Sequence, residues 1–379
     1  MTQVPTSALE LRSLITSQGQ LRLWLETTPV PAPADDEILV RIEAAPVNPS
    51  DILGLLGPAD IATLARDAAA QPPVTTADVP AELLASTAAR HDLPLSLGNE
   101  GAGIVVAAGD RARHLLGRAV ALRSPLGAYA QYRAVAAAEV LVLPEGTAPE
   151  AGASALINPM TALSMLETMR VEGHTALIHT AAASNLGQML VKICAADGVP
   201  LVNVVRSASQ VALLRELGAQ YVLDSSAADF DSALVEAIEA TGATLAFDAI
   251  GGGDMAERLL TAMGVVTTRR MTRYDRYGSS THRQVYLYGT LDPSPTILTR
   301  RSGLAWGVGG WLLTWRLRQF GEAAAARMRE RIVAELETTF ASRYGERITL
   351  AQLVEPETIR RYTRRATGEK FLVAPNRGA

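Results

Sequence analysis

The sequence predicts an α/β protein with two parts, a small β-rich domain and a domain built on a parallel sheet. In the N-terminal part, short stretches alternate apolar or β-branched residues with polar ones and are divided by glycine, which is typical of an irregular β domain. From about residue 155, short apolar runs alternate with amphipathic stretches at the spacing of βαβ units. That rhythm favours a parallel sheet covered by helices on both faces.

We expect the β-rich part over residues 1–154, with strands at Glu37–Ala45, Gly101–Ala108 and Ala119–Leu122. Residues 54–95 interrupt this pattern. They are rich in alanine, proline and aspartate, and their runs ADIATLARDAAA and PAELLASTAARH predict a helical insertion.

The parallel-sheet domain is expected over residues 155–320. Its predicted strands are Ala176–Thr180, Leu201–Val205, Tyr221–Leu223, Leu245–Asp248 and Val285–Tyr288, and its predicted helices are Leu186–Ala196, Ser209–Leu217, Asp231–Ala240 and Asp254–Met263.

Residues 265–283 break the βαβ rhythm and carry several arginines against the single acid Asp275. The arginines are Arg269, Arg270, Arg273, Arg276 and Arg283. A long loop is usually either functional or poorly ordered, so two interpretations remain open: a solvated loop, or a lid that faces a phosphate.

The composition excludes several classes of protein. The chain has 379 residues, of which 48% are hydrophobic and 20% charged; this indicates about two globular domains rather than a disordered or fibrous chain. The net charge of -4 gives no basic surplus for nucleic acid. Cys194 is the only cysteine, so no intramolecular disulfide can form and a cytoplasmic location is expected. The basic residues are almost all arginine and alanine is abundant, which favours a bacterial source with a GC-rich genome.

Two segments bear on membranes and secretion. Met1–Arg12 lacks a basic start followed by an apolar stretch, so no secretory signal is expected there. The most apolar run, Gly303–Trp315, is far shorter than the roughly 20 residues that span a bilayer. It predicts a buried or interface helix or strand.

A dinucleotide-binding turn is predicted at Thr180–Gln188, TAAASNLGQ, between a strand and a helix. A pyrophosphate needs small residues there, so that backbone N–H groups and the helix N-terminus can approach it. Ala181, Ser184 and Gly187 occupy the three small positions of the usual glycine pattern. A plain packed turn is the alternative interpretation.

The next predicted strand ends in Arg206 and Ser207. An acid at this place pairs with the ribose 2′-hydroxyl of NAD, whereas an arginine accommodates a 2′-phosphate. NADPH is therefore the favoured cofactor, and a surface arginine without a ligand is the alternative.

No metal site is predicted. Zinc sites use three or four ligands, commonly His and Cys, whereas the five histidines of this chain are scattered without ligand spacing. They are His91, His114, His174, His179 and His282. We interpret His174 and His179, which flank the first strand of the parallel sheet, as structural.

The ordered motifs of the chain resemble those of the medium-chain dehydrogenase/reductase superfamily. They include NPSD from Asn48, GNEGAG from Gly98, NPMTA from Asn158 and AAASNLG from Ala181, followed by ELGAQYVLD, FDAIGG, YLYGTL and TGEKFLV. The resemblance is to the zinc-free branch of quinone reductases and 2-enoyl thioester reductases. Zinc-dependent members carry ligands where this chain has Asn48, Asn99 and Asn158.

This resemblance implies a GroES-like β domain completed by residues 321–379, a Rossmann domain inserted into it, and an active site in the cleft between the two. It implies that Asn48, Asp51, Asn158 and Thr161 are catalytic. The cofactor contacts implied by the turn and the resemblance are Thr161, Ala181, Ser184, Asn185, Leu186, Gly187, Arg206, Ser207, Ile250, Tyr288 and Gly289.

The expected reaction is hydride transfer from NADPH to a quinone or to the C=C bond of an enone. The developing oxyanion would be held by Asn48 or a backbone N–H, and the proton donor is Asp51 or water, with a plain turn or cap role for Asp51 as the alternative. A second hypothesis is a 2-enoyl thioester reductase that uses Tyr129 or Tyr288, although residues 52–97 lack the tyrosine of that group. A third is a nucleotide-binding module, redox-sensing or structural, without turnover.

A homodimer is also expected. Trp306, Trp311 and Trp315 lie among small apolar residues directly after the predicted last strand, where the family commonly forms its subunit contact. Tryptophan and arginine are enriched at interface centres. A helix buried within one chain is the alternative.

Overall fold

The computed structural model describes residues 4–299, 302–364 and 368–378. The chain divides into two compact units. Unit 1 comprises residues 1–157 and 332–379, and unit 2 comprises residues 158–331. The domain boundaries predicted from the sequence fall after residues 154 and 320. The second lies further on because helix α10 (Glu322–Ala334) is tied to unit 2, where Ser164 Oγ donates to Met328 Sδ and Arg331 pairs with Asp197.

Unit 1 is built on two sheets. The first has the strand order β4-β5-β2-β1-β6, and the second has the order β10-β8-β7-β3-β20-β19, with β9 also paired to β3. These strands are β1 (Ser7–Ile15), β2 (Gln20–Pro29), β3 (Glu37–Pro46), β4 (Ala65–Asp67), β5 (Val74–Asp78), β6 (Leu95–Ser96), β7 (Gly101–Ala108), β8 (Ala119–Leu122), β9 (Tyr132–Ala136), β10 (Leu141–Val142), β19 (Glu346–Ile348) and β20 (Phe371–Val373).

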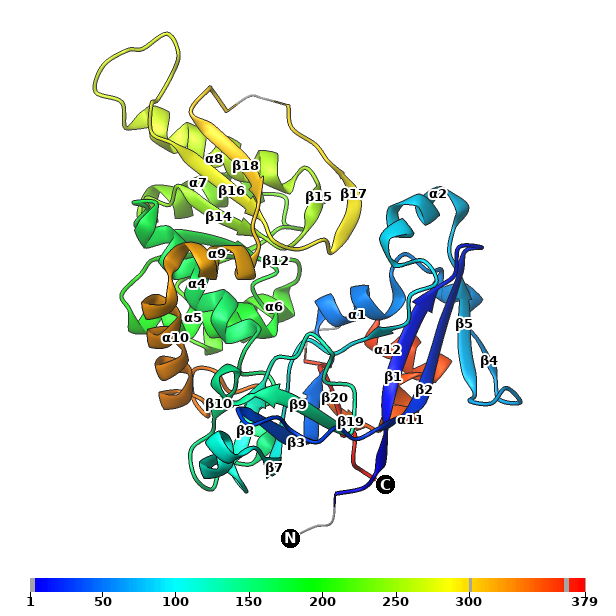
Figure 1. The fold of residues 1–379 in the computed structure, drawn as a ribbon. Coiled ribbons are helices and arrows are strands. Elements are labelled where there is room, and N and C mark those ends of the chain that lie inside the picture. Colours follow the sequence, from blue (N-terminus) through cyan, green and yellow to red (C-terminus); the bar gives the residue numbers. More distant parts are fainter. Residues whose placement is uncertain (1–3, 300–301, 365–367, 379) are drawn as a thin grey trace. The chain divides into compact units, whose positions relative to one another are not determined.

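Short helices connect the strands of unit 1 (Figure 1). The α-helices are α1 (Pro49–Leu56), α2 (Ala81–Leu84), α3 (Pro149–Gly152), α11 (Leu350–Leu353) and α12 (Pro356–Tyr362), and the 3-10 helices are η1 (Ile61–Thr63), η2 (Ala85–Arg90), η3 (Asp110–Leu115) and η4 (Ala137–Glu139). The C-terminal strand β20 pairs with β3, with Leu372 opposite Pro46. One apolar core therefore joins residues from both ends of the chain, such as Leu11, Ile42 and Val373.

The helical insertion predicted over residues 54–95 is wrong in its middle part. Strands β4 and β5 form a hairpin there, and β5 extends the sheet by pairing with β2, with Leu21 opposite Ala77. The segment VTTAD of β5 is β-branched and buries Val74, Thr75 and Ala77, so its packing surface favours a strand despite the alanine-rich surroundings.

Unit 2 contains a six-stranded parallel sheet with the order β13-β12-β11-β14-β16-β18. The order reverses at β11, so the carboxyl ends of β11 and β14 flank a topological switch point. The strands are β11 (Leu177–Thr180), β12 (Leu201–Val205), β13 (Tyr221–Asp224), β14 (Leu245–Asp248), β16 (Arg283–Leu287) and β18 (Trp306–Gly310), and a separate parallel pair joins β15 (Gly251–Gly253) to β17 (Asp292–Thr296).

Helices cover both faces of this sheet. Helices α7 and α8 pack on each other on one face, and α4, α5 and α9 pack together on the other (Figure 1). The helices are α4 (Asn158–Val171), α5 (Asn185–Ala196), α6 (Ala208–Glu216), α7 (Phe230–Thr241), α8 (Met255–Arg269) and α9 (Leu313–Phe320). The core includes Ile178 and Val204 from the sheet and Leu234 and Leu259 from the helices.

The arginine-rich segment 265–283 is only in part a loop. Helix α8 continues to Arg269 and buries Val266 and Thr267, and the guanidinium of Arg269 pairs with Glu239 at 2.8 Å. At the other end, Arg283 is buried in β16 and donates to Ala305 O. Both arginines are therefore structural.

The last strand of the sheet lies further along the chain than predicted. Strand β16 covers Arg283–Leu287, and a further strand, β18, occupies the segment that was expected to follow the sheet. Trp311 is 6% exposed, donates from Nε1 to Thr168 Oγ1 at 3.1 Å and contacts Phe247 edge to face. The expectation of Trp311 at a subunit interface is wrong, because it belongs to the core of unit 2.

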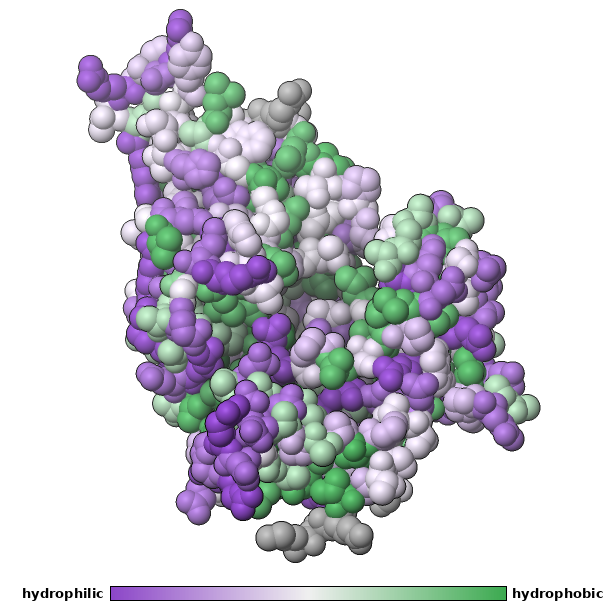
Figure 2. Space-filling view, in the orientation of Figure 1, coloured by the Kyte–Doolittle hydropathy of each residue, from purple (hydrophilic) through white to green (hydrophobic). Residues whose placement is uncertain are grey.

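Hydrophobic side chains do reach the surface elsewhere in this part of unit 2 (Figure 2). Leu304, Leu312 and Trp315 are exposed. Among the helices of the described residues, none is long and apolar enough to cross a membrane.

Candidate functional site

Asp51 and Asn48 lie together at the start of α1 in unit 1. Asn48 is the residue before the helix, and its backbone N–H donates to Asp51 Oδ2 at 2.9 Å, which is the return bond of a capping box. Asn99 N donates to the other carboxylate oxygen, Oδ1, at 2.7 Å. Asp51 therefore makes the contact that the cap interpretation expects. With the side chain only 2% exposed, the helix start also places a carboxyl group in the interior.

Glu100 is the second buried carboxylate of this cluster and is 1% exposed. Its Oε1 accepts from Asn48 Nδ2 at 2.9 Å, and its Oε2 accepts from the backbone N–H groups of Leu156 and Ile157, also at 2.9 Å. One N–H of the Asn48 amide is therefore already used by Glu100. Within the described part of the chain, Asn48 Oδ1 is buried and has no hydrogen-bond partner.

Lys370 brings a cation to the same place from the other end of the chain. It directly precedes β20, and its Nζ donates to Ser154 Oγ at 2.7 Å. Ser154 Oγ is in turn 2.8 Å from the hydroxyl of Tyr344, and Nζ lies 5.7 Å from the centroid of the Tyr344 ring. These contacts fix the position of the ammonium group.

The three ionisable groups change one another's proton affinity. Burial raises the pKa of Asp51 to about 7, although two backbone N–H groups oppose the shift. Burial also raises the pKa of Glu100, while Lys370 lowers it. Burial lowers the pKa of Lys370 to about 8, against the attraction of both carboxylates. A strongly shifted carboxyl group of this kind is a candidate for proton transfer near neutral pH.

Tyr129 packs beside Asp51 but is committed to the backbone. It is fully buried, and its hydroxyl donates to Pro46 O at 2.9 Å. Burial, with Asp51 nearby, raises its pKa well above the ordinary value. These contacts show that Tyr129 packs inside the β-rich unit.

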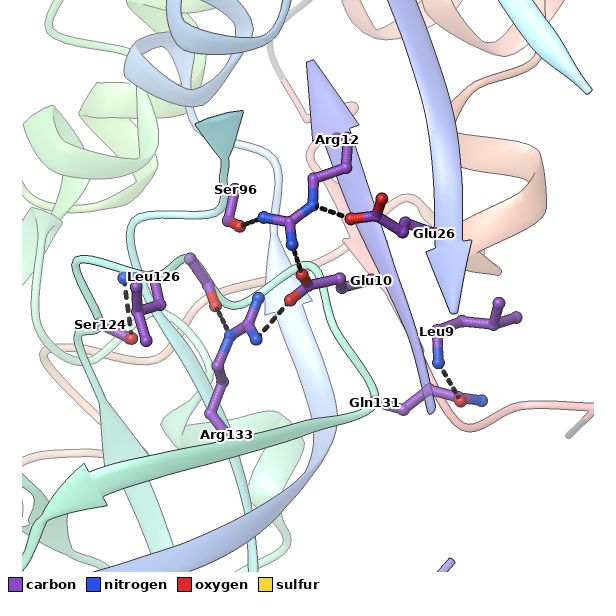
Figure 3. A network of polar contacts seen from close by, with 10 residues as sticks. Leu9, Glu10, Arg12, Glu26, Ser96, Ser124, Leu126, Gln131 and Arg133 are labelled. Carbon is purple, nitrogen blue, oxygen red and sulfur yellow. Dashed lines mark hydrogen bonds and ion pairs between the residues drawn. The ribbon is translucent and has the colours of Figure 1, made fainter. Parts of the chain in front are cut away.

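A charged network around Glu10 connects β1 to two neighbouring segments of unit 1 (Figure 3). Glu10 in β1 is 4% exposed and pairs with Arg12 and with Arg133, the latter at 2.5 Å. Arg12 also donates to Ser96 in β6, and Arg133 Nε donates to Gly127 O at 2.6 Å.

Those two attachments fix neighbouring loops against each other. Ala128 N donates to Gly98 O at 2.8 Å, and Tyr129 N donates to Leu97 O at 2.9 Å. The first loop leads into Asn99 and the second carries Tyr129, so the network positions both residues beside Asp51.

The predicted dinucleotide turn in unit 2 has the expected local structure. Ser184 caps α5 by accepting from Gly187 N at 3.1 Å, and Asn185 and Leu186 form the first turn of the helix. A Cβ on Gly187 would lie 2.1 Å from Ala182 O, so only glycine allows this close approach of helix and turn. Ala181 has a positive φ of 49°, a conformation that glycine adopts more easily.

Asp248, at the carboxyl end of β14, organises the switch point. Its Oδ1 accepts from Thr180 Oγ1 at 2.6 Å and from Ile250 N at 3.0 Å, and its Oδ2 accepts from Gly251 N at 3.1 Å. The side chain is fully buried. This fixes the turn that contains Ile250 against the end of β11.

The other predicted cofactor contacts of unit 2 lie at the same edge of the sheet. Arg206 follows β12 and is exposed, and Ser207 precedes α6. Tyr288 and Gly289 follow β16, and a Cβ on Gly289 would lie 2.5 Å from Ala249 O.

Tyr288 does not have a free hydroxyl. It is 2.7 Å from His179 Nε2, and the two rings stack. Burial lowers the pKa of His179 to about 3, so this histidine is neutral. The structural interpretation of His179 agrees with this position in the sheet.

Asn158 and Thr161 lie in the first turn of α4, in unit 2. Thr161 is buried and Asn158 is half-buried. Of the four residues expected to be catalytic, the structure brings Asn48 together with Asp51 in one unit and Asn158 together with Thr161 in the other.

Sequence reasoning missed Glu100, Lys370, Ser154 and Tyr344 as members of the site, and Asp248 at the sheet edge. One signal was available for Lys370. Lysine occurs at only two positions, Lys192 and Lys370, among 35 basic residues. A lysine in a chain that otherwise uses arginine indicates a place where a cation that can lose its proton is useful.

The fold combines a GroES-like β unit with a Rossmann-like parallel-sheet unit. Family models match both: the alcohol dehydrogenase GroES-like domain over residues 34–145 and the zinc-binding dehydrogenase over residues 185–266. The chain belongs to the medium-chain dehydrogenase/reductase superfamily.

The curated relatives that match this chain have names of three different kinds. The synaptic vesicle membrane protein VAT-1 homolog of Rattus norvegicus is 28% identical over 67% of this chain and 57% of its own length. The mitochondrial enoyl-[acyl-carrier-protein] reductase of Xenopus tropicalis is 32% identical over 58% and 57%. The quinone oxidoreductase of Pseudomonas aeruginosa is 30% identical over 42% and 50%. The chain spans between 50% and 57% of the length of these relatives.

Solved structures share the whole fold. A quinone oxidoreductase of Pseudomonas syringae pv. tomato superposes with a TM-score of 0.65 at 19% identity, covering 97% of this chain and 100% of that one. A mycobacterial protein complexed with NADPH superposes with a TM-score of 0.65 at 20% identity, again covering 97% and 100%.

The residues of this chain do not fit the zinc that one family model names. Zinc sites are built from thiolate, imidazole and carboxylate ligands, whereas Asn48 and Asn99 are amides. The Asp51 and Glu100 carboxylates already accept hydrogen bonds on every oxygen atom. Among the described residues, no group of three or more His, Cys, Asp or Glu side chains could hold a metal ion.

Proposed function

We propose that this protein is a zinc-independent, NADPH-dependent oxidoreductase that reduces a quinone or the activated C=C bond of an enone. One observation carries the proposal: a buried carboxyl group, Asp51, whose pKa is raised to about 7, lies beside Asn48 where zinc-dependent relatives have metal ligands. A protonated acid there can complete a reduction without a Lewis acid.

The nucleotide would be held by unit 2. The capped start of α5 offers backbone N–H groups and a positive helix end to the pyrophosphate. The exposed Arg206, directly after β12, would pair with the 2′-phosphate, and Tyr288 and Gly289 would face the nicotinamide. NADPH, when bound, supplies a hydride to the β-carbon of the substrate.

The residues of unit 1 would handle the charge and the proton. As the hydride adds to the β-carbon, the π electrons move onto the substrate oxygen, and the remaining amide N–H of Asn48 or a backbone N–H holds that oxyanion. The proton of Asp51 then passes to the α-carbon. This leaves Asp51 as a carboxylate stabilised by Asn48 N and Asn99 N.

A 2-enoyl thioester reductase is the second candidate, supported by the NPMTA segment and by the 32% identity to an enoyl-[acyl-carrier-protein] reductase. The tyrosines considered as its acid are both engaged, since Tyr129 donates to Pro46 O and Tyr288 is paired with His179. Asp51 is therefore the proton donor that we propose for either substrate class.

The test is NADPH oxidation with matched acceptors: a set of quinones, simple enones and enoyl thioesters. Turnover of quinones or enones, with thioesters at least tenfold slower, supports the first candidate, and the reverse order supports the second. Binding of NADPH without turnover of any acceptor would favour a nucleotide-binding module instead.

A further inference from the structure

Lys370 is a cation that the proposed reaction does not yet use. It is one of two lysines in the chain. It is half-buried, and its Nζ donates to Ser154 Oγ, which is hydrogen-bonded to the hydroxyl of Tyr344. No hydride or proton step above assigns it a role. Its position beside two buried carboxylates nevertheless requires an explanation, because a buried charge is costly unless it is compensated.

The groups that face Asp51 come from several elements. Glu100 precedes β7, Tyr129 precedes β9 and Lys370 precedes β20. Glu100 accepts from Asn48 Nδ2 at 2.9 Å, and Val47 N donates to Phe371 O at 3.0 Å, so Lys370 directly precedes a residue that is bonded to the segment leading into Asn48 and Asp51. Tyr362 of α12 belongs to the same apolar core as Tyr129, and the ring of Tyr344 lies 5.7 Å from Lys370 Nζ. Lys370 is the only cation among these described groups.

We propose that Lys370 is a positioning residue for the proton donor: its ammonium group, fixed by Ser154 and Tyr344, determines whether Asp51 carries a proton.

The charge balance of the cluster supports this role. Two carboxylates and one ammonium group leave one negative charge without a partner, so in a buried site one carboxyl group keeps a proton. Glu100 accepts three hydrogen bonds from N–H donors and Asp51 accepts two. Glu100 is therefore the better stabilised anion, and the proton resides on Asp51.

A lysine suits this role better than an arginine would. Arginine stays charged at any pH that proteins tolerate, whereas a buried lysine can lose its proton. When Lys370 loses its charge at higher pH, the attraction that favours the Asp51 carboxylate disappears, and Asp51 binds its proton more tightly. The two groups titrate as a pair, which keeps the acid available over a wider pH range.

The first experiment does not depend on turnover. The titration of Asp51 is followed by infrared difference spectroscopy of the protonated carboxyl band, with Asp51→Asn as the blank. We expect Lys370→Met to move the midpoint upward by about one pH unit or more, because one nearby positive charge is lost. Lys370→Arg, which keeps the charge, should move it much less, and Lys192→Met, the same change at the other lysine, should not move it.

Two milder variants protect the test against misfolding of Lys370→Met. Ser154→Ala and Tyr344→Phe each remove one contact that fixes the ammonium group, and each should move the Asp51 midpoint upward by a smaller amount. The proposal is overturned if folded Lys370→Met protein, with an unchanged circular dichroism spectrum, titrates at Asp51 like the wild type.

The consequence for turnover rests on the proposed function. If Asp51 donates the proton, the alkaline limb of the kcat profile in Lys370→Met should shift with the Asp51 midpoint. A shifted Asp51 titration with an unshifted kcat profile would support the role of Lys370 in setting the charge of Asp51 and would refute Asp51 as the donor. The two ideas can therefore fail separately.

Discussion

The two units build their polar sites in opposite ways. In unit 1 the site is a buried group of ionisable side chains, Asp51, Glu100 and Lys370, whose proton affinities are shifted toward neutrality. In unit 2 the site lies at the carboxyl edge of the parallel sheet. It consists of backbone N–H groups, small residues and one carboxylate, Asp248, whose two oxygen atoms both accept hydrogen bonds. His179, in the neighbouring strand β11, is neutral.

The difference separates two tasks. A site made of fixed dipoles binds a charged ligand without changing its own protonation, which suits a nucleotide that must bind over a range of pH. A site made of coupled acids and a lysine exchanges protons but depends on pH. Unit 1 should therefore control the chemistry and unit 2 the affinity, and the following experiments test that division.

The largest effect is expected for Asp51→Asn. The amide keeps the volume of the side chain but cannot donate an acidic proton, so kcat should fall by ~100-fold or more, with the dissociation constant of NADPH unchanged. Steady-state kinetics and fluorescence titration measure the two. A parallel loss of NADPH affinity would contradict the division between the units.

The same variant has a stability signature. The pKa of Asp51 is raised in the folded protein from 3.8 to about 7, so the folded state binds the proton more tightly than the unfolded state. The wild type should therefore lose stability as pH rises from about 4 to 7, by roughly 2 to 4 kcal/mol. Denaturant titrations should show this slope in the wild type and not in Asp51→Asn.

Arg206→Ala should change affinity without changing the proton chemistry. A charge-assisted contact to the 2′-phosphate contributes about 1.5 to 3 kcal/mol, so NADPH binding should weaken roughly ten- to a hundredfold while NADH binding stays nearly the same. Isothermal titration with both nucleotides checks it. Equal losses for the two would show that Arg206 has another role.

Gly187→Ala tests the backbone cradle. The added Cβ would lie 2.1 Å from Ala182 O, so the turn and α5 must separate, at a cost of about 1 to 3 kcal/mol of stability, and NADPH binding should weaken. Gly310→Ala is the matched control, because nothing lies within 4 Å of its added Cβ. A nucleotide affinity that survives Gly187→Ala would argue against this turn as the binding site.

A smaller effect concerns assembly, which we propose to be a homodimer formed by the exposed apolar residues of unit 2. Leu312 is 61% exposed and Trp315 is 48% exposed, and an exposed apolar patch favours association. Light scattering should report a dimer, and Trp315→Asp should weaken it. Trp311→Asp is unsuitable because Trp311 is in the core. A monomer at micromolar concentration would refute the dimer.

No effect at all is expected from a chelator. Amides, Asn48 and Asn99, stand where zinc-dependent relatives have ligands, and every carboxylate oxygen of Asp51 and Glu100 accepts from an N–H group. Prolonged dialysis against a zinc chelator should therefore leave turnover unchanged. Elemental analysis gives the second measurement. One full equivalent of zinc per chain would overturn the metal-free proposal.

Prediction from sequence was better for unit 2 than for unit 1, for a physical reason. Several strands and helices of unit 2 were predicted to within a residue or two, because βαβ periodicity and the small-residue turn are local patterns. For the segment of β18 the sequence left helix and strand open, because the three glycines of WGVGG weaken any local preference, and its pairing with β16 decides its structure.

The site of unit 1 could be predicted only in part. Asn48 and Asp51 are three positions apart and form a local helix cap, which a short motif can indicate. Glu100, Ser154, Tyr344 and Lys370 join them across as many as 319 positions of sequence, the span from Asp51 to Lys370. No local pattern encodes such a meeting: the pairing of β7 with β3 brings Glu100 to the site, and the pairing of β20 with β3 brings Lys370.

That pairing has a consequence for the order of events during synthesis. Unit 2 is one continuous stretch, residues 158–331, and it separates the two pieces of unit 1. At 5–20 residues per second, a ribosome takes roughly 10 to 30 s to make a stretch of that length. Throughout this time β3 lacks its partner strand β20. Unit 2 can fold while the nascent chain still lacks Lys370. Lys370, the cation that we propose sets the charge of Asp51, is thus made only after unit 2 is complete, so the proposed nucleotide site can form before the proposed acid site.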